Sequence, residues 1–291
     1  MNRHRAFWLM LLVTASWGAS YMWMKIALIS VAPLFLVGLR FTVAFLATII
    51  IFARVLKRPT HQEVVASFIL GTLLFCAFTF VMIGLQHTDA STAGFLLSTT
   101  TVFVAIFEAI LKKRFPRLST VIATIVVVIG LYLLVANGAG LKLNFNALLC
   151  LACAAIYAIY IIASDILSKK HLVTFSVSIW QLGVAGGEGL IFGGLLDGVT
   201  LPQTTSQWGA VLALGLICSA FGFVAQTQVQ HYLAPDTVGL IYSLEPIFSA
   251  IFAFLTLGEV LSGQQYFGAA IIFLSVVASE IVKARWPRAE S

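Results

Sequence analysis

Two apolar segments of the chain carry aromatic residues with polar tips at helical spacing. Trp17 and Tyr21 lie four positions apart in the first segment, and Tyr157 and Tyr160 lie three apart in another. Such side chains combine a large contact area with a few hydrogen-bonding groups, which suits a cavity for a zwitterion or a flat ring. Ordinary packing between helices is the alternative interpretation of both pairs.

Further polar residues occupy corresponding places in two other apolar segments. Tyr242 and Ser243 lie just before Pro246, and a proline within a helix removes a backbone hydrogen bond and frees a carbonyl that a substrate ammonium could use. Ser98 and Thr99 offer hydroxyls at the matching depth, although such hydroxyls can also bond to their own helix. A kink that only shapes packing is the alternative. The predicted substrate-binding residues are Trp17, Tyr21, Ser98, Thr99, Tyr157, Tyr160, Tyr242 and Ser243.

Three ionisable residues lie deep inside apolar segments, where charges are rare and are functional candidates by default. Arg40 and Glu188 are expected to pair with each other as a structural ion pair, and the alternative is that Arg40 binds a substrate carboxylate. Glu245 is a candidate proton carrier. Together with Pro246, these three residues form the predicted coupling or gating set.

Motifs for catalysis, nucleotide hydrolysis and metal binding do not occur in the sequence. There is no GxxxxGK[ST] phosphate loop and no HExxH metal pair. Cys150 and Cys153 spell CxxC, but they lie within an apolar segment and not at an exposed turn. We expect no catalytic residue, no cofactor and no metal site, so any transport must be driven by a gradient.

The elements that must position these residues are membrane helices. The chain has 291 residues, of which 60% are hydrophobic and 10% charged, whereas soluble domains are roughly 45–50% apolar and about 25% charged. Apolar windows of about 20 residues, the length that crosses a bilayer, recur without the two-residue alternation of membrane strands. We predict an all-α membrane protein with ten transmembrane helices, near residues 7–29, 34–55, 64–85, 91–112, 118–136, 146–167, 174–196, 208–230, 237–257 and 264–284.

Glycine residues crowd the seventh of these windows. They recur at spacings of three to five residues, and small residues at such spacing allow membrane helices to approach closely. We expect this segment to pack tightly against a neighbour along Gly183, Gly186, Gly187, Gly189, Gly193 and Gly194.

The distribution of lysine and arginine predicts the orientation in the membrane. Of the 17 basic residues, only Lys25, Arg40 and Lys142 lie away from the predicted inner face, and an excess of Lys and Arg marks the cytoplasmic side. We expect a multi-pass protein of a cell inner membrane with both termini in the cytoplasm. Its partners would be the lipid bilayer and a small-molecule substrate. The short loops offer no folded basic surface for nucleic acid.

The chain also contains an internal repeat, in which two segments of the first half align with two of the second: 71–87 with 215–231, and 92–106 with 237–251. It therefore divides into residues 1–140 and residues 141–291. Each half would hold five helices, and because five is odd, the second half enters the bilayer from the opposite side. Inverted repeats of this kind are typical of transporters that work by alternating access.

These features resemble the EamA family of the drug/metabolite transporter superfamily. The resemblance rests on the two five-helix units, on Trp17 and Gly18 in the first helix, on Arg40 in the second, and on the run SLEPIFSAIFAFLTLGE from Ser243 to Glu259. It implies a ten-helix secondary transporter, most often an exporter of amino acids, other small metabolites or amphipathic toxins. Within the family, the aromatic residues of the first and sixth helices resemble those of the YddG type of amino-acid exporter.

The first half departs from this pattern at two positions. Thr101 stands where the second half has Pro246, and Arg114 stands where it has Glu259. The resemblance therefore does not imply that the two halves kink alike.

We predict a secondary active or facilitative exporter of small metabolites, foremost aromatic or other neutral amino acids, acting as a monomer or weak dimer. Protons are the candidate coupling ion. A sugar-phosphate or nucleotide-sugar antiporter of the same superfamily is one alternative, but it would need several basic residues in mid-membrane, where this chain has Arg40. A membrane-embedded enzyme or receptor is the other, and it would need an acid and histidine cluster or a signalling domain.

Overall fold

A computed structural model of the protein describes residues 1–88, 90–113, 118–135, 145–172, 175–257 and 262–285. Every regular element in these residues is helical. They are α1 (Arg3–Gly18), α2 (Ser20–Ala27), α3 (Pro33–Phe52), α4 (His61–Gln86), α5 (Ala90–Ser98), α6 (Thr100–Lys112), α7 (Leu118–Val135), α8 (Phe145–Lys169), α9 (Phe175–Leu196), α10 (Thr205–Ala213), the π-helix η1 (Leu214–Phe221), α11 (Gly222–Val229), α12 (Pro235–Tyr242), α13 (Glu245–Leu257) and α14 (Gly263–Arg285).

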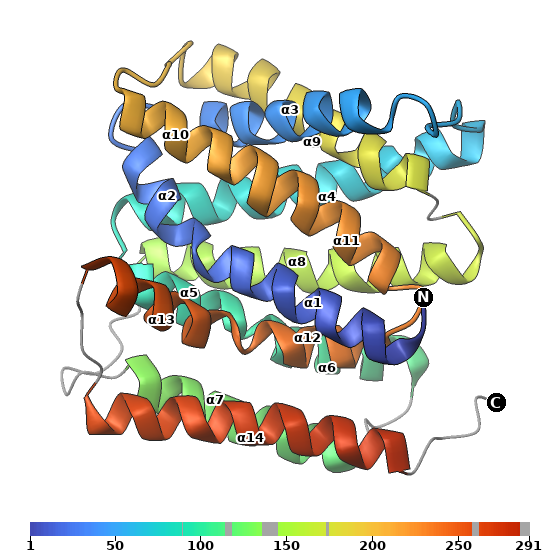
Figure 1. The fold of residues 1–291 in the computed structure, drawn as a ribbon, viewed down its shortest axis with the longest axis vertical. Helices are drawn as coiled ribbons and strands as arrows, with labels where there is room; N and C mark the ends of the chain where they lie inside the picture. Colours follow the sequence, from blue (N-terminus) through green and yellow to red (C-terminus); the bar gives the residue numbers. More distant parts are fainter. Residues whose placement is uncertain (89, 114–117, 136–144, 173–174, 258–261, 286–291) are drawn as a thin grey trace.

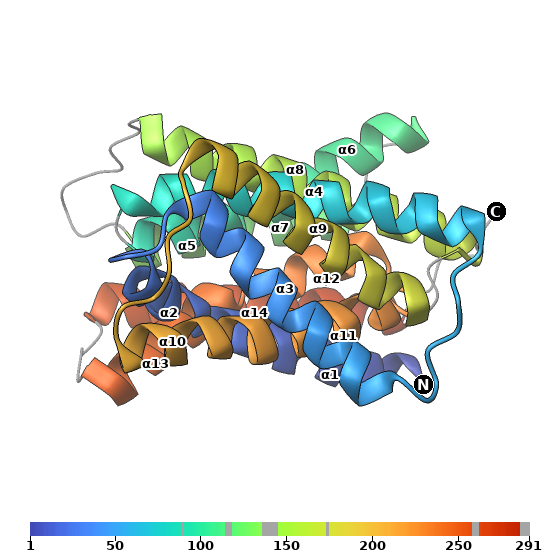
Figure 2. The same cartoon turned by 90° about the horizontal axis from the view of Figure 1, so that it is seen from above.

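The helices lie side by side along a common direction (Figures 1 and 2). Five segments are long and apolar enough to cross a bilayer: α3, α4, α8, α9 and the continuous stretch Thr205–Val229, which joins α10, η1 and α11. Large apolar side chains such as Ile50 and Leu195 are about three-quarters exposed on the outside of the bundle. An exposed apolar surface of this extent requires lipid around it.

The helix ends at one side of the bundle share basic residues. In Figure 1, α1 begins at the right-hand side, and α3, α6, α8 and α14 all end there. We call this side the basic end. Its described residues include Arg3, Arg5, Arg54, Lys57, Arg58, Lys112, Lys113, Lys169, Lys170, Lys283 and Arg285.

Helices of each half of the chain pack against helices of the other half. α4 of the first half packs against α8 and α9, and the corresponding stretch α10–η1–α11 of the second half packs against α1, α2 and α3. α3 packs against α9, and α7 packs against α14 (Figure 1). The two halves therefore enclose a common centre to which each contributes equivalent helices.

Three of the predicted windows, 7–29, 91–112 and 237–257, are divided into two shorter helices near mid-length. The interruption predicted beside Pro246 is present, but Pro246 is the second residue of α13, where a missing N–H has little effect. The first half breaks at the corresponding place, Thr99, without a proline. There the hydroxyls of Ser98, Thr99 and Thr100 all bond to carbonyls three or four residues back. Bonds of this kind bend helices.

Glycines bring α9 into backbone contact with α3. A Cβ on Gly186 would lie 2.7 Å from the Thr42 nitrogen, and one on Gly189 would overlap the backbone of Gly38. By contrast, a Cβ on Gly187 or Gly194 would meet no atom within 4 Å. The close packing expected for this helix therefore belongs to one of its faces only.

Candidate functional site

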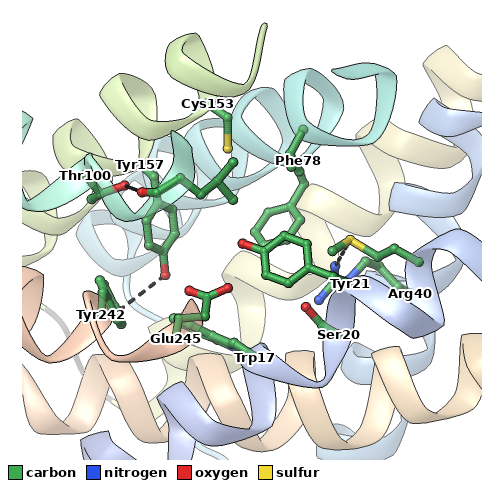
Figure 3. A pocket seen from close by; sticks show the side chains of 13 residues that line it. Trp17, Ser20, Tyr21, Arg40, Phe78, Thr100, Cys153, Tyr157, Tyr242 and Glu245 are labelled. Carbon is green, nitrogen blue, oxygen red and sulfur yellow. Dashed lines mark hydrogen bonds between the residues drawn. The ribbon is translucent and has the colours of Figure 1, made fainter. Parts of the chain in front are cut away.

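A cavity lies at the centre of the bundle, where the divided helices meet α3, α4 and α8 (Figure 3). Its volume is about 40 Å³, measured as the space open to the centres of water molecules. One water needs roughly 10–15 Å³ of such space, so the cavity has room for only a few waters in this conformation. The lining includes six residues that the sequence singles out: Trp17, Tyr21, Arg40, Tyr157, Tyr242 and Glu245.

Three aromatic rings from three different helices form one wall. The ring centroid of Trp17 lies 5.2 Å from that of Tyr242 and 6.1 Å from that of Tyr157. The hydroxyls of Tyr157 and Tyr242 are 3.4 Å apart. The indole N–H of Trp17 donates to the carbonyl of Cys218, at 2.7 Å, within η1. Since that donor is occupied, Trp17 contributes its aromatic surface to the wall.

Arg40 supplies a positive charge to the opposite part of the cavity. Its side chain is 1% exposed, and its Nε donates to the hydroxyl of Ser219 at 2.9 Å. The guanidinium carbon lies 4.4 Å from the centre of the Phe78 ring, a distance typical of cation–π contacts. Among the described residues, no acidic side chain forms an ion pair with Arg40. The charge is therefore held in place but not neutralised.

Glu188 does not pair with Arg40, so the ion pair that the sequence predicts between them is wrong. Its Oε1 accepts a hydrogen bond of 2.6 Å from the hydroxyl of Thr72 on α4, whereas Arg40 points toward η1 and the Phe78 ring. The two residues lie on adjacent helices, but their side chains turn to different neighbours. Glu188 is also absent from the cavity lining.

Glu245, the first residue of α13, brings an acid to the same cavity. Its carboxyl group is partly buried and forms no ion pair within the described ranges. Tyr21 is 1% exposed, and its hydroxyl lies close to the carboxyl group of Glu245. Figure 3 shows the Tyr21 ring between Glu245 and Arg40. The cavity thus presents one acidic side chain, one basic side chain and a tyrosine hydroxyl beside the acid.

The remaining predicted binding residues lie outside the lining. The hydroxyls of Ser98, Thr99 and Ser243 bond to carbonyls of their own helices. Tyr160 is fully buried behind Tyr157, with the two rings stacked 5.4 Å apart, and its hydroxyl donates to Gln181. These side chains therefore shape the elements around the cavity without facing it.

Several lining residues are not among the binding residues that the sequence predicts. Ser20, Met24 and Thr100 lie next to residues that it names, or one turn away on the same helix. Cys153 precedes Tyr157 by four positions, so helical periodicity alone places it on the same face. Phe78 is an ordinary apolar residue of a long apolar helix and carries no signal in the sequence.

Comparison with known proteins agrees with this architecture. The profile of the EamA-like transporter family matches residues 4–136 and again residues 144–279, which together cover most of the chain. The chain belongs to the EamA-like transporter family. Members of this family are transporters, so this EamA-like protein is a membrane transporter and not an enzyme.

Related EamA-like proteins come from distant prokaryotes. An uncharacterized transporter of Archaeoglobus fulgidus is 29% identical over 91% of this chain and 82% of its own length. The uncharacterized transporter YoaV of Bacillus subtilis is 24% identical over 94% of this chain and 96% of its own length. A probable amino-acid metabolite efflux pump of Salmonella typhimurium is 26% identical over 94% of this chain and 93% of its own length.

A crystal structure of another protein shares the fold. It superposes with a TM-score of 0.80 at 21% identity and covers 99% of this EamA-like chain and 100% of the other. The arrangement of helices described above is therefore that of a known structure along nearly the whole chain.

Proposed function

We propose that this EamA-like transporter exports amino acids, aromatic or other neutral ones, which it binds as zwitterions. The observation that carries the proposal is the pair of opposite charges, Arg40 and Glu245, on one cavity without an ion pair to any described residue. A zwitterion offers a carboxylate to the first and an ammonium to the second. Hydrogen bonds to charged groups contribute about 1.5–3 kcal/mol each.

The aromatic wall suits the same class of substrate. An ammonium near Glu245 would also face the rings of Trp17, Tyr157 and Tyr242, and cation–π contacts stabilise a desolvated ammonium by up to about 2 kcal/mol. The same rings provide contact area for an apolar or aromatic side chain. The Salmonella typhimurium relative described as a probable amino-acid metabolite efflux pump supports this choice.

The transport cycle we propose is alternating access between two inverted halves of five transmembrane helices, residues 1–140 and 141–291. The two matches to the family profile and the exchange of packing partners between halves support it. With a cavity of about 40 Å³, the present conformation is contracted, and a substrate needs helices to separate before it enters. Secondary active and facilitative transport both fit this cycle.

We further propose that the basic end of the bundle faces the cytoplasm, with both chain termini on that side and the protein in a cell inner membrane. The support is the gathering of arginine and lysine at helix ends on this one side. Such an excess follows the positive-inside rule.

The sugar-phosphate alternative is less well supported by the cavity. A phosphate carries up to two negative charges and is usually held by more than one basic side chain. Arg40 is the one basic residue among those that line the described cavity, and Glu245 would repel an anion.

Counterflow in proteoliposomes tests the proposed substrate class. Vesicles that contain the purified transporter and an excess of unlabelled leucine or phenylalanine should accumulate the radiolabelled amino acid transiently, and empty vesicles should not. Competition with a panel of amino acids, amines and carboxylic acids should show inhibition mainly by compounds that carry both charged groups. Failure of every amino acid in the panel would contradict the proposal.

Glu245 is the proposed proton-coupling residue. Glu245→Gln should leave amino-acid exchange measurable, at higher substrate concentrations, because the amide oxygen still accepts a hydrogen bond. Uptake driven by an imposed pH gradient should be abolished, because the amide cannot carry a proton at physiological pH. Glu188→Gln is the control, since Glu188 faces Thr72 outside the cavity. An unchanged response to the gradient in Glu245→Gln would remove protons from the mechanism.

A further inference from the structure

Polar side chains continue from the cavity toward the basic end, along the contact between α8 and α11. On α8, Ser164 and Ser168 follow Tyr157 at helical spacing. On the other side, Gln226 in α11 and Gln230 just after it face them. All these residues apart from Tyr157 are at least 94% buried. We call this contact the α8–α11 seam.

Three hydrogen bonds cross the seam, one after another along its length. The Tyr157 hydroxyl donates to Oε1 of Gln226 at 2.9 Å, beside the cavity. Further along, Nε2 of Gln230 donates to the carbonyl of Ile161 at 3.5 Å. At the basic end, the hydroxyl of Ser168 lies 2.6 Å from Nδ1 of His231, which is exposed. The seam therefore connects the cavity with the surface.

Between these bonds, polar atoms are buried without a partner. Within the described part of the chain, the Ser164 hydroxyl, Nε2 of Gln226 and Oε1 of Gln230 make no hydrogen bond. An unsatisfied buried polar atom costs roughly 1–3 kcal/mol. Three of them on one seam make the closed seam considerably less stable than an apolar contact of the same shape.

The neighbouring contact between α9 and α11 differs in this respect. There the Thr227 hydroxyl donates to the Ser178 hydroxyl at 2.6 Å, and Nε2 of Gln228 donates to the same oxygen at 2.8 Å. The hydroxyls of Thr227 and Ser178 therefore both have partners. α11 packs closely against α9 along the helices, whereas α8 and α11 meet mainly through the three hydrogen bonds of the seam. Separating α11 from α8 breaks these three bonds but gives the unpaired polar atoms access to new partners.

A permanent helix contact in a membrane is more stable without unpaired polar side chains, because small or apolar side chains pack there at no such cost. Polar atoms become favourable when the contact opens and water or a polar substrate reaches them. We propose that the α8–α11 seam is the closed translocation route between the cavity and the basic end, lined to pass a zwitterion. The proposal rests on the proposed function, because it takes the cavity as the substrate site.

Cysteine labelling tests whether the seam opens. Ser164→Cys is placed in a background whose four native cysteines are replaced by alanine, and a membrane-impermeant methanethiosulfonate is added at the basic end. Ser67→Cys is the matched control. Ser67 is 2% exposed and lies near the start of α4, which is also at the basic end. Its hydroxyl donates to the Glu63 carbonyl and therefore has a partner.

We expect the Ser164→Cys variant to react at least about tenfold faster than the Ser67→Cys variant, because a transiently open state exposes the seam alone. Equal rates in the two variants would overturn the route. The labelling needs no substrate. Fast labelling of the seam in a protein that moves no amino acid would therefore support the route while contradicting the proposed substrate.

A cross-link provides a second, independent measurement. Ser168→Cys with His231→Cys, joined by a short bifunctional methanethiosulfonate, should hold the seam closed and stop transport until a reducing agent is added. Ser178→Cys with Thr227→Cys, oxidised to a direct disulfide across the α9–α11 contact and verified by loss of free thiol, should leave most transport intact. Transport that continues with the first link in place would overturn the proposal.

Discussion

Gly189→Val is expected to prevent accumulation of folded protein in the membrane. A Cβ at Gly189 would overlap the backbone of Gly38, so valine would force α3 and α9 apart. Backbone atoms cannot rotate away as a side chain can, and this pair of helices forms one of the central contacts of the bundle. The cost should exceed the roughly 1–3 kcal/mol of ordinary overpacking. Size-exclusion chromatography of a fluorescent fusion protein measures the loss of the monodisperse species.

Gly194→Val supplies the matched control on the same helix. A side chain there would meet no protein atom within 4 Å and would point toward lipid. The variant should accumulate to the level of the unmodified protein, since the propensity difference between glycine and valine in a helix is small. A similar profile for the two variants would show that Gly189 is not a packing position.

The glycine residues of α9 show which parts of the helix packing the sequence predicts and which it does not. Small residues at short intervals correctly predict that this helix packs closely against another. They do not identify the partner or the face, because Gly187 is as good a match to the pattern as Gly186 and yet points into open space. The contacting face is set by Gly38 and Thr42 on α3, which no local pattern connects to α9.

The sequence likewise predicts the helical segments better than the positions at which they break. Apolar windows predict helices because a segment in a bilayer must satisfy its own backbone, and five of the described segments are long and apolar enough to cross one. The windows do not show that the first-half segment breaks at Thr99, since that break depends on three hydroxyl-to-carbonyl bonds and not on a proline. Different residues therefore interrupt the helices at equivalent places in the two halves.

For the site, three of the four aromatic residues picked out by helical periodicity line the cavity, whereas Ser98 and Thr99 do not. Trp17, Tyr21 and Tyr157 reach the cavity because a large ring extends beyond the backbone of its own helix. Ser98 and Thr99 do not, because a short hydroxyl bonds to the nearest carbonyl one turn back. Polar residue type alone therefore overestimates the number of side chains that face the cavity.

The sequence does not predict which partner each deep charge has. Arg40 and Glu188 lie on packed helices, yet Arg40 turns to Ser219 and Phe78 and leaves its charge facing the cavity with Glu245. An Arg40–Glu188 pair would have been a purely structural element. The observed separation of Arg40 from every described acid is what makes it available to a substrate carboxylate.

Arg40→Gln is therefore expected to weaken amino-acid binding strongly. The substitution removes a charge-assisted bond of about 1.5–3 kcal/mol to the substrate carboxylate, which corresponds to roughly 10- to 100-fold in affinity. Glutamine is neutral and can still bond to the Ser219 hydroxyl, so the fold should persist. Binding of a radiolabelled amino acid to the purified protein measures the change.

The comparison that isolates the carboxylate uses a decarboxylated ligand. A simple amine with the same side chain binds the unmodified transporter without help from Arg40, so Arg40→Gln should leave its affinity nearly unchanged or improve it through loss of repulsion. Ser219→Ala removes only the partner of the Arg40 Nε and should reduce amino-acid affinity to a smaller extent. If Arg40→Gln weakens the amine and the amino acid equally, the arginine supports the cavity structure and does not contact the carboxylate.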